Sequence, residues 1–581
     1  MVFDMKMIET MKNAVLESAN KNRRLFTAVL INFLVVVTCF IFLFFTEKTD
    51  DYIMKQILDG AYSGTPDAHL LFCSYFLGIV LRLLQSFVPQ LPWFELSQLA
   101  ALFVSYVVIT YFIWDDRSSK KSLFFLLPFL LTFGFDSYAK LTFTKTAGVV
   151  IAAGLLWLSH SIEDRKKISC LFSVLLTLLG SFYRIKCMYL VAAVFGGFSV
   201  ADVIVTGYRQ QSLKDCVKKA FFCIAPIAGM VVLAFALNVA GTALFTADDA
   251  WREYKEYNKY KVELQDRGWP SYDGHLEEYE ALGITRNDYV MWAQNRDYSD
   301  PDRYNTEMLM KVCEFKDQNN TSIRDFLRIY PLKFTSFKLA IALLFICAAV
   351  VCSNLNGKWF YVFAAFCACT IFEYYFWCGN RFGRYHTDYI LFFAVAVCLL
   401  ARVKTACVEA TVVKVSPVIL ALLLAFILDR DYKYISSDTY DGSALSVSEG
   451  VSRLVMDELS ADKENLYVLS NSELYGLIRA YGVSESFVPG AWSNIFPLNG
   501  YMVPTTRKVL DNYDVKNIYF SMLTEKNIYY VTSTEKERLN TIRTYLKEHY
   551  HGWADYTLVE RMGSVEIYRF FIKPKMGTFI N

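Results

Sequence analysis

The sequence lacks the short motifs that would assign it directly to a well-defined enzyme class. It contains no P-loop, no dinucleotide-binding glycine motif, no G-x-S-x-G nucleophile elbow and no HExxH metal motif. ATP-driven transport and hydrolysis by those mechanisms therefore have no support. The net charge is only +2 at pH 7, so the composition does not suggest a nucleic-acid partner.

Two further patterns are missing. The 14 cysteines include no CxxC pair and no Cys/His metal spacing, and several lie in apolar runs, which is typical of small buried side chains. No internal sequence repeat is visible either. Many transporters are built from repeats, so its absence weakens a transporter interpretation.

Long apolar runs separated by charged joints dominate the chain. Hydrophobic residues make up 54% of the sequence, and runs of about 14 to 21 residues recur. The first, Leu25–Phe45, is too long for the hydrophobic region of a cleaved signal peptide and no small-residue cleavage site follows it, so it is interpreted as an uncleaved span. We expect further spans at Leu96–Trp114, Ser122–Phe135, Thr146–Ser159, Ile168–Ser181, Met188–Val205, Phe221–Phe245, Phe337–Val351, Trp359–Trp377, Tyr389–Ala401 and Val415–Leu428. The sequence predicts an α-helical polytopic membrane protein with about eleven transmembrane helices.

The distribution of Lys and Arg predicts the orientation. Five basic residues in Met1–Arg24 directly precede the first span, which places this segment in the cytoplasm. The apolar segment Leu70–Val88 contains Arg82, Gln85 and two serines, and is interpreted as interfacial. Five joints holding 14 Lys or Arg then face the cytoplasm, against six in the three short outer joints. A spanning Leu70–Val88 would reverse this arrangement.

This orientation predicts the domain organisation. Residues 1–24 form a cytoplasmic segment, residues 25–428 a transmembrane domain with outer loops 46–95 and 247–335, and residues 429–581 an extracytoplasmic domain. In the second loop we expect helices at Trp251–Leu264, Leu276–Ala281 and Thr306–Asn319. In the C-terminal domain we expect strands at Leu466–Leu469, Asn517–Phe520, Ile528–Val531 and Val565–Phe570, with a helix at Thr534–Tyr550. An α/β or α+β domain of about 150 residues follows from this pattern.

An acidic motif follows the first span. Asp50 and Asp51 are adjacent, and a Gly/Pro turn then leads to Asp67 and His69. Neighbouring carboxylates at a membrane surface are usually hydrated, paired with cations or functional. These four residues could also form an oxygen-rich site for a divalent metal such as Mg²⁺ or Mn²⁺.

The order of acidic motif, interfacial apolar segment and Pro/Trp corner resembles the GT-C class of polytopic glycosyltransferases. That class includes protein O-mannosyltransferases, oligosaccharyltransferase catalytic subunits and lipid A aminoarabinose transferases. The motif match is confined to Asp50–Trp93, although the hydropathy layout of the whole chain also resembles envelope proteins of Gram-positive bacteria in this class. Asp-Asp-Tyr departs from the Asp-Glu or Glu-x-Asp pairs that are usual there.

The resemblance implies a sugar donor carried on a polyprenyl phosphate or pyrophosphate, and a glycan, lipid or protein acceptor. A carboxylate would act as general base on an acceptor hydroxyl. By position this base is Asp50 or Asp51; we favour Asp51, and the departure in the motif leaves both open. It also leaves the dependence on a metal open.

A leaving phosphate requires cations at the outer ends of the spans. The candidates are Arg184 and Lys186 after one span, and Arg381 and Arg384 before another. Arginines at a membrane boundary also commonly extend toward lipid headgroups. Lys140 and Lys145 are interpreted as ordinary flanking charges.

Two other ionisable residues are candidates for the same cavity. Glu373 lies within the span Trp359–Trp377, where a carboxylate is costly without a partner. It either pairs with Arg381 or Arg384 or faces the donor or acceptor. His386 follows the two arginines closely.

The leading hypothesis is a glycosyltransferase of the cell membrane that acts at the outer face. The alternatives are a flippase or transporter of lipid-linked sugars, a polymerase or ligase of lipid-linked repeat units, and a non-catalytic scaffold or sensor. Charges at the outer ends of spans, rather than at mid-membrane, favour surface chemistry over transport.

Overall fold

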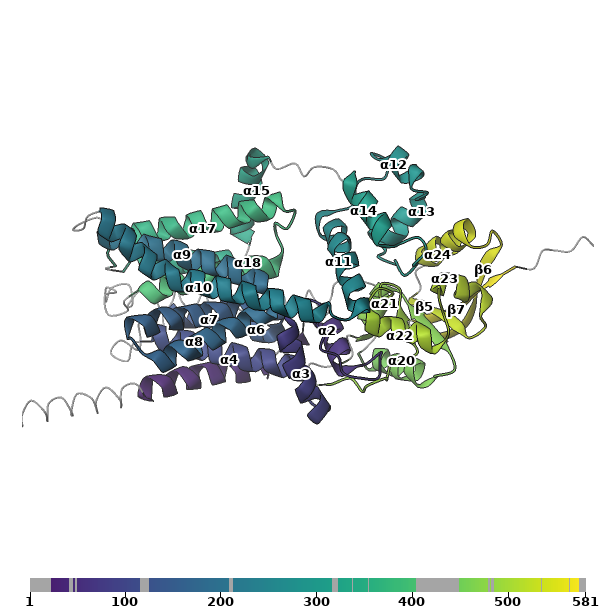
Figure 1. Cartoon of the computed structure of the whole chain (residues 1–581), viewed down its shortest axis with the longest axis horizontal. Coiled ribbons are helices and arrows are strands. Elements are labelled where there is room, and N and C mark those ends of the chain that lie inside the picture. Colours follow the sequence, from purple (N-terminus) through teal and green to yellow (C-terminus); the bar gives the residue numbers. More distant parts are fainter. Residues whose placement is uncertain are drawn as a thin grey trace, which may run out of the picture.

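The computed structural model describes residues 22–40, 45–46, 50–114, 125–207, 213–315, 322–336, 338–353, 355–403, 449–478, 481, 485–533, 536–563 and 565–573. Figure 1 shows two parts: a bundle of long helices, and a globular part at one end of it. We call the globular part the head; it comprises α2, residues 249–315 and residues 449–573.

Seven helices among the described residues are long and apolar enough to cross a membrane. They are the helix Asn22–Phe40, α4 (Trp93–Ile113), α7 (Phe143–Glu163), α9 (Ile185–Gly207), α10 (Leu213–Phe245), α17 (Lys358–Cys378) and α18 (Tyr385–Arg402). Shorter apolar helices occupy three more expected spans: Phe125–Ala139, which contains η2 (Leu130–Gly134) and α6 (Phe135–Ala139), α8 (Lys167–Tyr183) and α16 (Lys338–Val351). The expected span Val415–Leu428 lies outside the described residues. The chain is a helical polytopic membrane protein.

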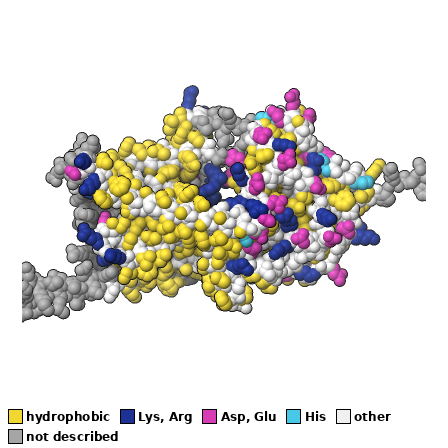
Figure 2. Space-filling model, in the orientation of Figure 1, with side chains coloured by type: hydrophobic (Ala, Val, Ile, Leu, Met, Phe, Trp, Pro, Cys, Tyr) yellow, Lys and Arg dark blue, Asp and Glu magenta, His cyan; other side chains and the backbone are white. Residues whose placement is uncertain are grey.

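The outer surface of the bundle is apolar, and its far end is basic. Only 11% of the most apolar stretch of α10 is buried inside the protein, and the side chain of Ile168 on α8 is 75% exposed. Figure 2 shows this hydrophobic surface over the bundle, with Lys and Arg gathered at the end away from the head. Exposure of so large an apolar surface to water is energetically unfavourable, so this surface is suited to contact with lipid.

The helix α3 (Tyr75–Phe87) occupies the segment that the sequence predicts to be interfacial. It is a short apolar helix of 13 residues. Leu77, Leu81 and Gln85 are buried, whereas Phe87 is 81% exposed. In Figure 1 α3 lies at the boundary between bundle and head. Gly78 permits its close packing on the preceding loop, because a Cβ there would lie 1.9 Å from the carbonyl oxygen of Ala68.

One hydrophobic core holds the head together. It includes Tyr52 and Ile57 of α2 (Asp50–Asp59), Trp251 of α11 (Asp249–Arg267) and Trp492 from the C-terminal part. The other helices of the second loop are α12 (Leu276–Ala281), α13 (Arg286–Tyr289), η3 (Val290–Gln294) and α14 (Thr306–Glu314). The helix α2, the second loop and the C-terminal part thus share one hydrophobic core.

The C-terminal part of the head is a mixed five-stranded sheet with flanking helices. Its strands are β3 (Leu466–Leu469), β4 (Ile495–Pro497), β5 (Ile528–Ser533), β6 (Ala554–Met562) and β7 (Val565–Ile572), in the order β4-β3-β5-β7-β6. The pairs of β3 with β4 and β5 are parallel, and those of β7 with β5 and β6 are antiparallel. The helices are α20 (Glu449–Ala461), α21 (Asn471–Ile478), α22 (Pro504–Asn512), α23 (Ile518–Thr524) and α24 (Lys536–His549).

The predicted strand at Asn517–Phe520 is wrong, because this segment begins α23. The side chain of Asn517 accepts hydrogen bonds from the backbone N–H groups of Tyr519 and Phe520. Such an N-cap satisfies the first donors of a helix and favours helix over strand for a short apolar run.

Short backbone contacts hold the chain on both sides of α2. The two-residue strands β1 (Phe45–Thr46) and β2 (Lys140–Leu141) pair in parallel just before α2 and α7 begin. The N–H of Gly490 donates to Gly60, and that of Trp492 donates to Ala61. These contacts fix the start of the first loop between the bundle and the C-terminal sheet. The helix α15 (Ile323–Ser336) connects the second loop to α16.

Candidate functional site at the N-terminus of α7

The two adjacent aspartates of the acidic motif diverge in the first turn of α2. Asp51 points into the bundle and is 3% exposed. Its Oδ1 accepts hydrogen bonds from the backbone N–H of Phe143, at 2.9 Å, and from Nε2 of Gln98, at 3.2 Å. Asp50 is half-buried, and its charge is close enough to interact with Tyr254 on α11. Of the two candidate bases, Asp51 is the one directed at the transmembrane helices.

Arg184 reaches the same helix end from α8. Its Nη1 donates to Oγ1 of Thr144 across 2.9 Å. The guanidinium lies over the ring of Phe143, at 5.0 Å, and that of Phe72, at 5.9 Å. These cation–π contacts with two rings help to hold the guanidinium in place. Lys186, two residues further on, is exposed in the first turn of α9.

A buried ion pair completes the arrangement around α7. The Nζ of Lys145 lies 2.8 Å from Oδ1 of Asp136, and each of these side chains is 1% exposed. The hydroxyl of Tyr385 donates to Oδ2 of Asp136 across 2.5 Å. Lys145 is therefore not an ordinary flanking charge, as the sequence suggested, but one half of an ion pair at the junction of three segments.

Three consecutive residues at the start of α7 thus organise the site. Phe143 contacts Asp51, Thr144 contacts Arg184, and Lys145 contacts Asp136. The N-cap of α7 is Thr142, whose side chain accepts from the backbone N–H of Lys145. A helix N-terminus presents N–H groups and positive potential, so it favours anionic groups nearby.

Arg381 and Arg384 lie between α17 and α18 and bind one carboxylate of the head. Asp266 on α11 contacts Nη2 of Arg381, at 2.5 Å, and Nη1 of Arg384, at 3.0 Å. Tyr385, the partner of Asp136, directly follows Arg384. His386 is half-buried in the first turn of α18, and Glu373 is fully buried on α17. The sequence did not connect Asp266 with this pair of arginines.

Asp67 and His69 form a separate pair on an aromatic wall. The Nδ1 of His69 lies 2.5 Å from Oδ1 of Asp67. The imidazole stacks on Trp251, at 4.6 Å between centroids, and contacts Tyr75 and Phe245. Burial opposes ionisation of Asp67, but the hydrogen bonds and charge of His69 outweigh it and lower the pKa of this carboxyl. This pair faces α10 and α11.

The sequence analysis missed a second polar cluster on α2. Lys55 and Glu95 form a buried ion pair of 3.0 Å, and the N–H of Phe487 donates to Asp59 across 2.8 Å. Burial raises the pKa of the Asp59 carboxyl to about 7. A signal was present in the sequence, because Asp51, Lys55 and Asp59 are four residues apart and share one helix face.

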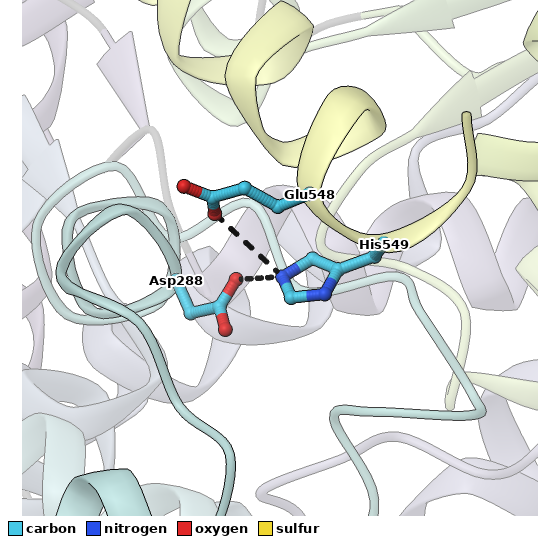
Figure 3. Close-up of side chains that lie close together, drawn as sticks. All are labelled: Asp288, Glu548 and His549. Carbon is cyan, nitrogen blue, oxygen red and sulfur yellow. Dashed lines mark hydrogen bonds and ion pairs between the residues drawn. The ribbon is translucent and has the colours of Figure 1, made fainter. Parts of the chain in front are cut away.

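The first-loop acids do not converge into a metal site. Among the described residues, one group of carboxylate and imidazole atoms lies within 4.8 Å: Asp288, Glu548 and His549 (Figure 3). Asp288 contacts His549 at 2.7 Å and Arg303 at 3.2 Å, and Glu548 accepts from the hydroxyl of Thr285. These carboxylates already have protein donors, so the group joins α13 to α24. The four residues Asp50, Asp51, Asp67 and His69 are not such a group.

Comparisons with known proteins give no assignment. No protein-family model matches this sequence, and no curated protein matches it either.

Proposed function

We propose that this protein is a membrane glycosyltransferase of the GT-C class. It transfers a sugar from a polyprenyl phosphate or pyrophosphate donor to a glycan, lipid or protein acceptor of the cell envelope. The residue range 1–24 lies in the cytoplasm, about eleven helices cross the membrane, and the head lies outside. The basic far end of the bundle supports this orientation.

One observation carries the proposal: the start of α7 joins Asp51 and Arg184, two residues from loops that are far apart in the sequence. A transferase of this class requires a carboxylate and a cation at one membrane boundary. The short helices α2 and α3, which follow the first span, also agree with the layout of the class.

In the proposed reaction, Asp51 takes the proton of an acceptor hydroxyl. The hydroxyl oxygen then attacks the anomeric carbon of the sugar, and the bond from this carbon to the phosphate oxygen breaks. The lipid phosphate leaves with the bonding electron pair. Arg184 stabilises the negative charge on this group, supported by the N-terminus of α7. No step is assigned to a metal, since the acids of the first loop do not converge.

The test uses purified protein in lipid nanodiscs with a panel of radiolabelled polyprenyl phosphate sugars. We expect sugar release or transfer by the wild type, its loss in Asp51→Asn, and its retention in Asp50→Asn. Thermal unfolding of each variant checks that the fold is intact. Loss in Asp50→Asn alone would move the base to Asp50. Donor binding without turnover, unchanged in both variants, would contradict a transferase and favour a flippase or a lipid-sugar-binding scaffold.

A further inference from the structure

The carboxylate of Asp266 on α11 contacts two arginines in the loop before α18, in the way that a bound anion would. The carboxylate of Asp266 accepts from Arg381 and from Arg384, and Nη2 of Arg384 also donates to the backbone carbonyl of Asp266 at 3.1 Å. Two guanidinium groups converge on one pair of oxygens, as they do on a phosphate. The arginine side chains are 27% and 36% exposed, so solvent or a ligand can reach them.

The surroundings place these arginines at the depth of lipid headgroups. Phe326 on α15 contacts Tyr374 and Trp377 of α17 and also Phe382, which lies between the two arginines. Aromatic clusters at the end of membrane-spanning helices mark the boundary between hydrocarbon and water. A phosphate attached to a prenyl chain would lie at this level.

We propose that Asp266 is an internal competitor for the phosphate of the lipid-linked donor at Arg381 and Arg384. In this structure its carboxylate holds α11 against the bundle. The donor carries one negative charge as a polyprenyl phosphate sugar and two as a pyrophosphate sugar, and its phosphate oxygens can accept hydrogen bonds from both guanidinium groups in place of the carboxylate. Binding therefore releases Asp266 and with it the C-terminal end of α11. The inference rests on the proposed function, since it takes its ligand from there.

The Asp136 contact couples this exchange to the candidate site. Tyr385 directly follows Arg384 and donates to Asp136, which pairs with Lys145 at the start of α7. An anion that repositions Arg384 therefore also acts on its neighbour Tyr385. Through Asp136 and Lys145, this residue is linked to the start of α7, which contacts Asp51 and Arg184. Asp266 is a positioning and competing group, and it takes no part in the chemical step.

The experiment measures binding of farnesyl phosphate to the full chain in nanodiscs. Asp266→Asn removes the competing charge while keeping the shape of the side chain, and we expect affinity to rise about fivefold or more. Arg384→Gln should weaken binding. The double variant Asp266→Asn/Arg384→Gln should bind farnesyl phosphate no more tightly than Arg384→Gln alone. Asp202→Asn is the matched control, because Asp202 forms a similar pair with Arg402, at 2.5 Å, at the far end of the bundle.

Two further arms identify the ligand and the movement. Farnesol tests the contribution of the chain alone, and inorganic phosphate tests the headgroup alone; we expect Asp266→Asn to leave farnesol binding unchanged and to increase phosphate binding. In the wild type, farnesyl phosphate should increase hydrogen exchange in residues 249–267, and in Asp266→Asn exchange should be high without ligand.

Unchanged or weaker farnesyl phosphate binding in folded Asp266→Asn would overturn the inference, as would an equal gain in Asp202→Asn. The readout is separate from sugar transfer. A gain in binding with no transfer from any donor would therefore overturn the proposed function and keep Asp266 as a competitor for an anionic lipid. Transfer without a gain in binding would overturn the inference alone.

Discussion

The backbone N–H of Phe143 donates a hydrogen bond to the carboxylate of Asp51, at 2.9 Å, across 92 positions of sequence. This bond ties the first loop to the start of α7. The next residue, Thr144, accepts from Arg184. A carboxylate and a guanidinium from different loops are therefore held one residue apart along the same helix.

Arg184 is expected to act on the donor rather than on the acceptor. Arg184→Gln should raise the KM for the donor about tenfold to a hundredfold, because a hydrogen bond to a charged group is worth about 1.5–3 kcal/mol. Arg184→Lys should be intermediate, since it keeps the charge but loses the planar fork that binds a phosphate through two hydrogen bonds. The measurement is steady-state transfer over a range of donor concentrations.

Lys167→Gln is the control for Arg184, because Lys167 lies at the other end of α8 and is exposed. It should leave the KM for the donor unchanged. A similar KM in wild type and Arg184→Gln would contradict the assignment of Arg184 to the phosphate.

The buried carboxyl of Asp59 should make the stability of the protein depend on pH. Its pKa is about 7 in the folded state and about 4 when unfolded, so the folded state binds more protons between these values. The stability that this carboxyl contributes is fully present below pH ~4 and is lost as the pH rises through ~7. The loss in the free energy of unfolding is at most about 4 kcal/mol. Thermal unfolding from pH 4 to 8, followed by tryptophan fluorescence, measures the effect.

Asp59→Asn removes this titration while keeping the hydrogen bond from Phe487 possible. The variant should lose less stability than the wild type between pH 4 and 7. If both proteins show the same dependence on pH, the titrating group is elsewhere.

The ion pair of Asp297 and Arg538 should stabilise the packing of the second loop on the C-terminal sheet. Asp297 is fully buried and Arg538 is 10% exposed, with 3.0 Å between Oδ2 and Nε. Asp297→Ala leaves a buried guanidinium without this partner, which should cost about 3–5 kcal/mol. The pair of half-buried Arg507 and exposed Glu253 is the comparison, and Glu253→Ala should cost no more than about 1 kcal/mol.

Urea unfolding of the head, with a double-mutant cycle over Asp297 and Arg538, measures the coupling. A coupling energy near zero would show that this ion pair does not stabilise the packing of the second loop on the C-terminal sheet.

The close packing of α3 on the first loop should not tolerate a larger residue at Gly78. Gly78→Ala places a methyl group against the carbonyl of Ala68, so α3 or the loop must move, at a cost of about 1–3 kcal/mol or more. Transfer activity should fall with stability, because the loop leads directly to Phe72, which lies under Arg184.

Gly197→Ala on α9 is the matched substitution, since no atom lies within 4 Å of the added Cβ. It should be neutral or slightly stabilising, as alanine is the better helix former. Equal unfolding temperatures for the two variants would contradict the tight packing at Gly78.

The sequence predicts the long helices well because apolar length is a local property. Helices occur at each expected span within the described residues, and the segment Leu70–Val88, which is interpreted as interfacial, contains the short helix α3. The weaker predictions concern the sheet. β4 has only three residues, and β6 is a mostly exposed strand at the edge of the sheet, so neither has a clear hydrophobic pattern.

The candidate site could be predicted only in part. The acidic motif stands out because two adjacent carboxylates follow the first apolar run, and Arg184 because it lies directly after another apolar run. Their meeting at α7 depends on contacts between distant segments, which local patterns do not encode. Lys145 and Asp266 were missed for the same reason, because each resembles an ordinary surface charge until its partner is known.

The most direct test of the central claim is to locate the donor phosphate. A polyprenyl phosphate sugar with a photoreactive group beside the phosphate would be crosslinked to the full chain in nanodiscs and mapped by mass spectrometry. We expect labelling of residues 143–145, of the segment around Arg184 and of residues 381–385, and its loss when unlabelled polyprenyl phosphate competes. Competed labelling confined to the far end of the bundle or to the C-terminal sheet would contradict a donor site at the start of α7.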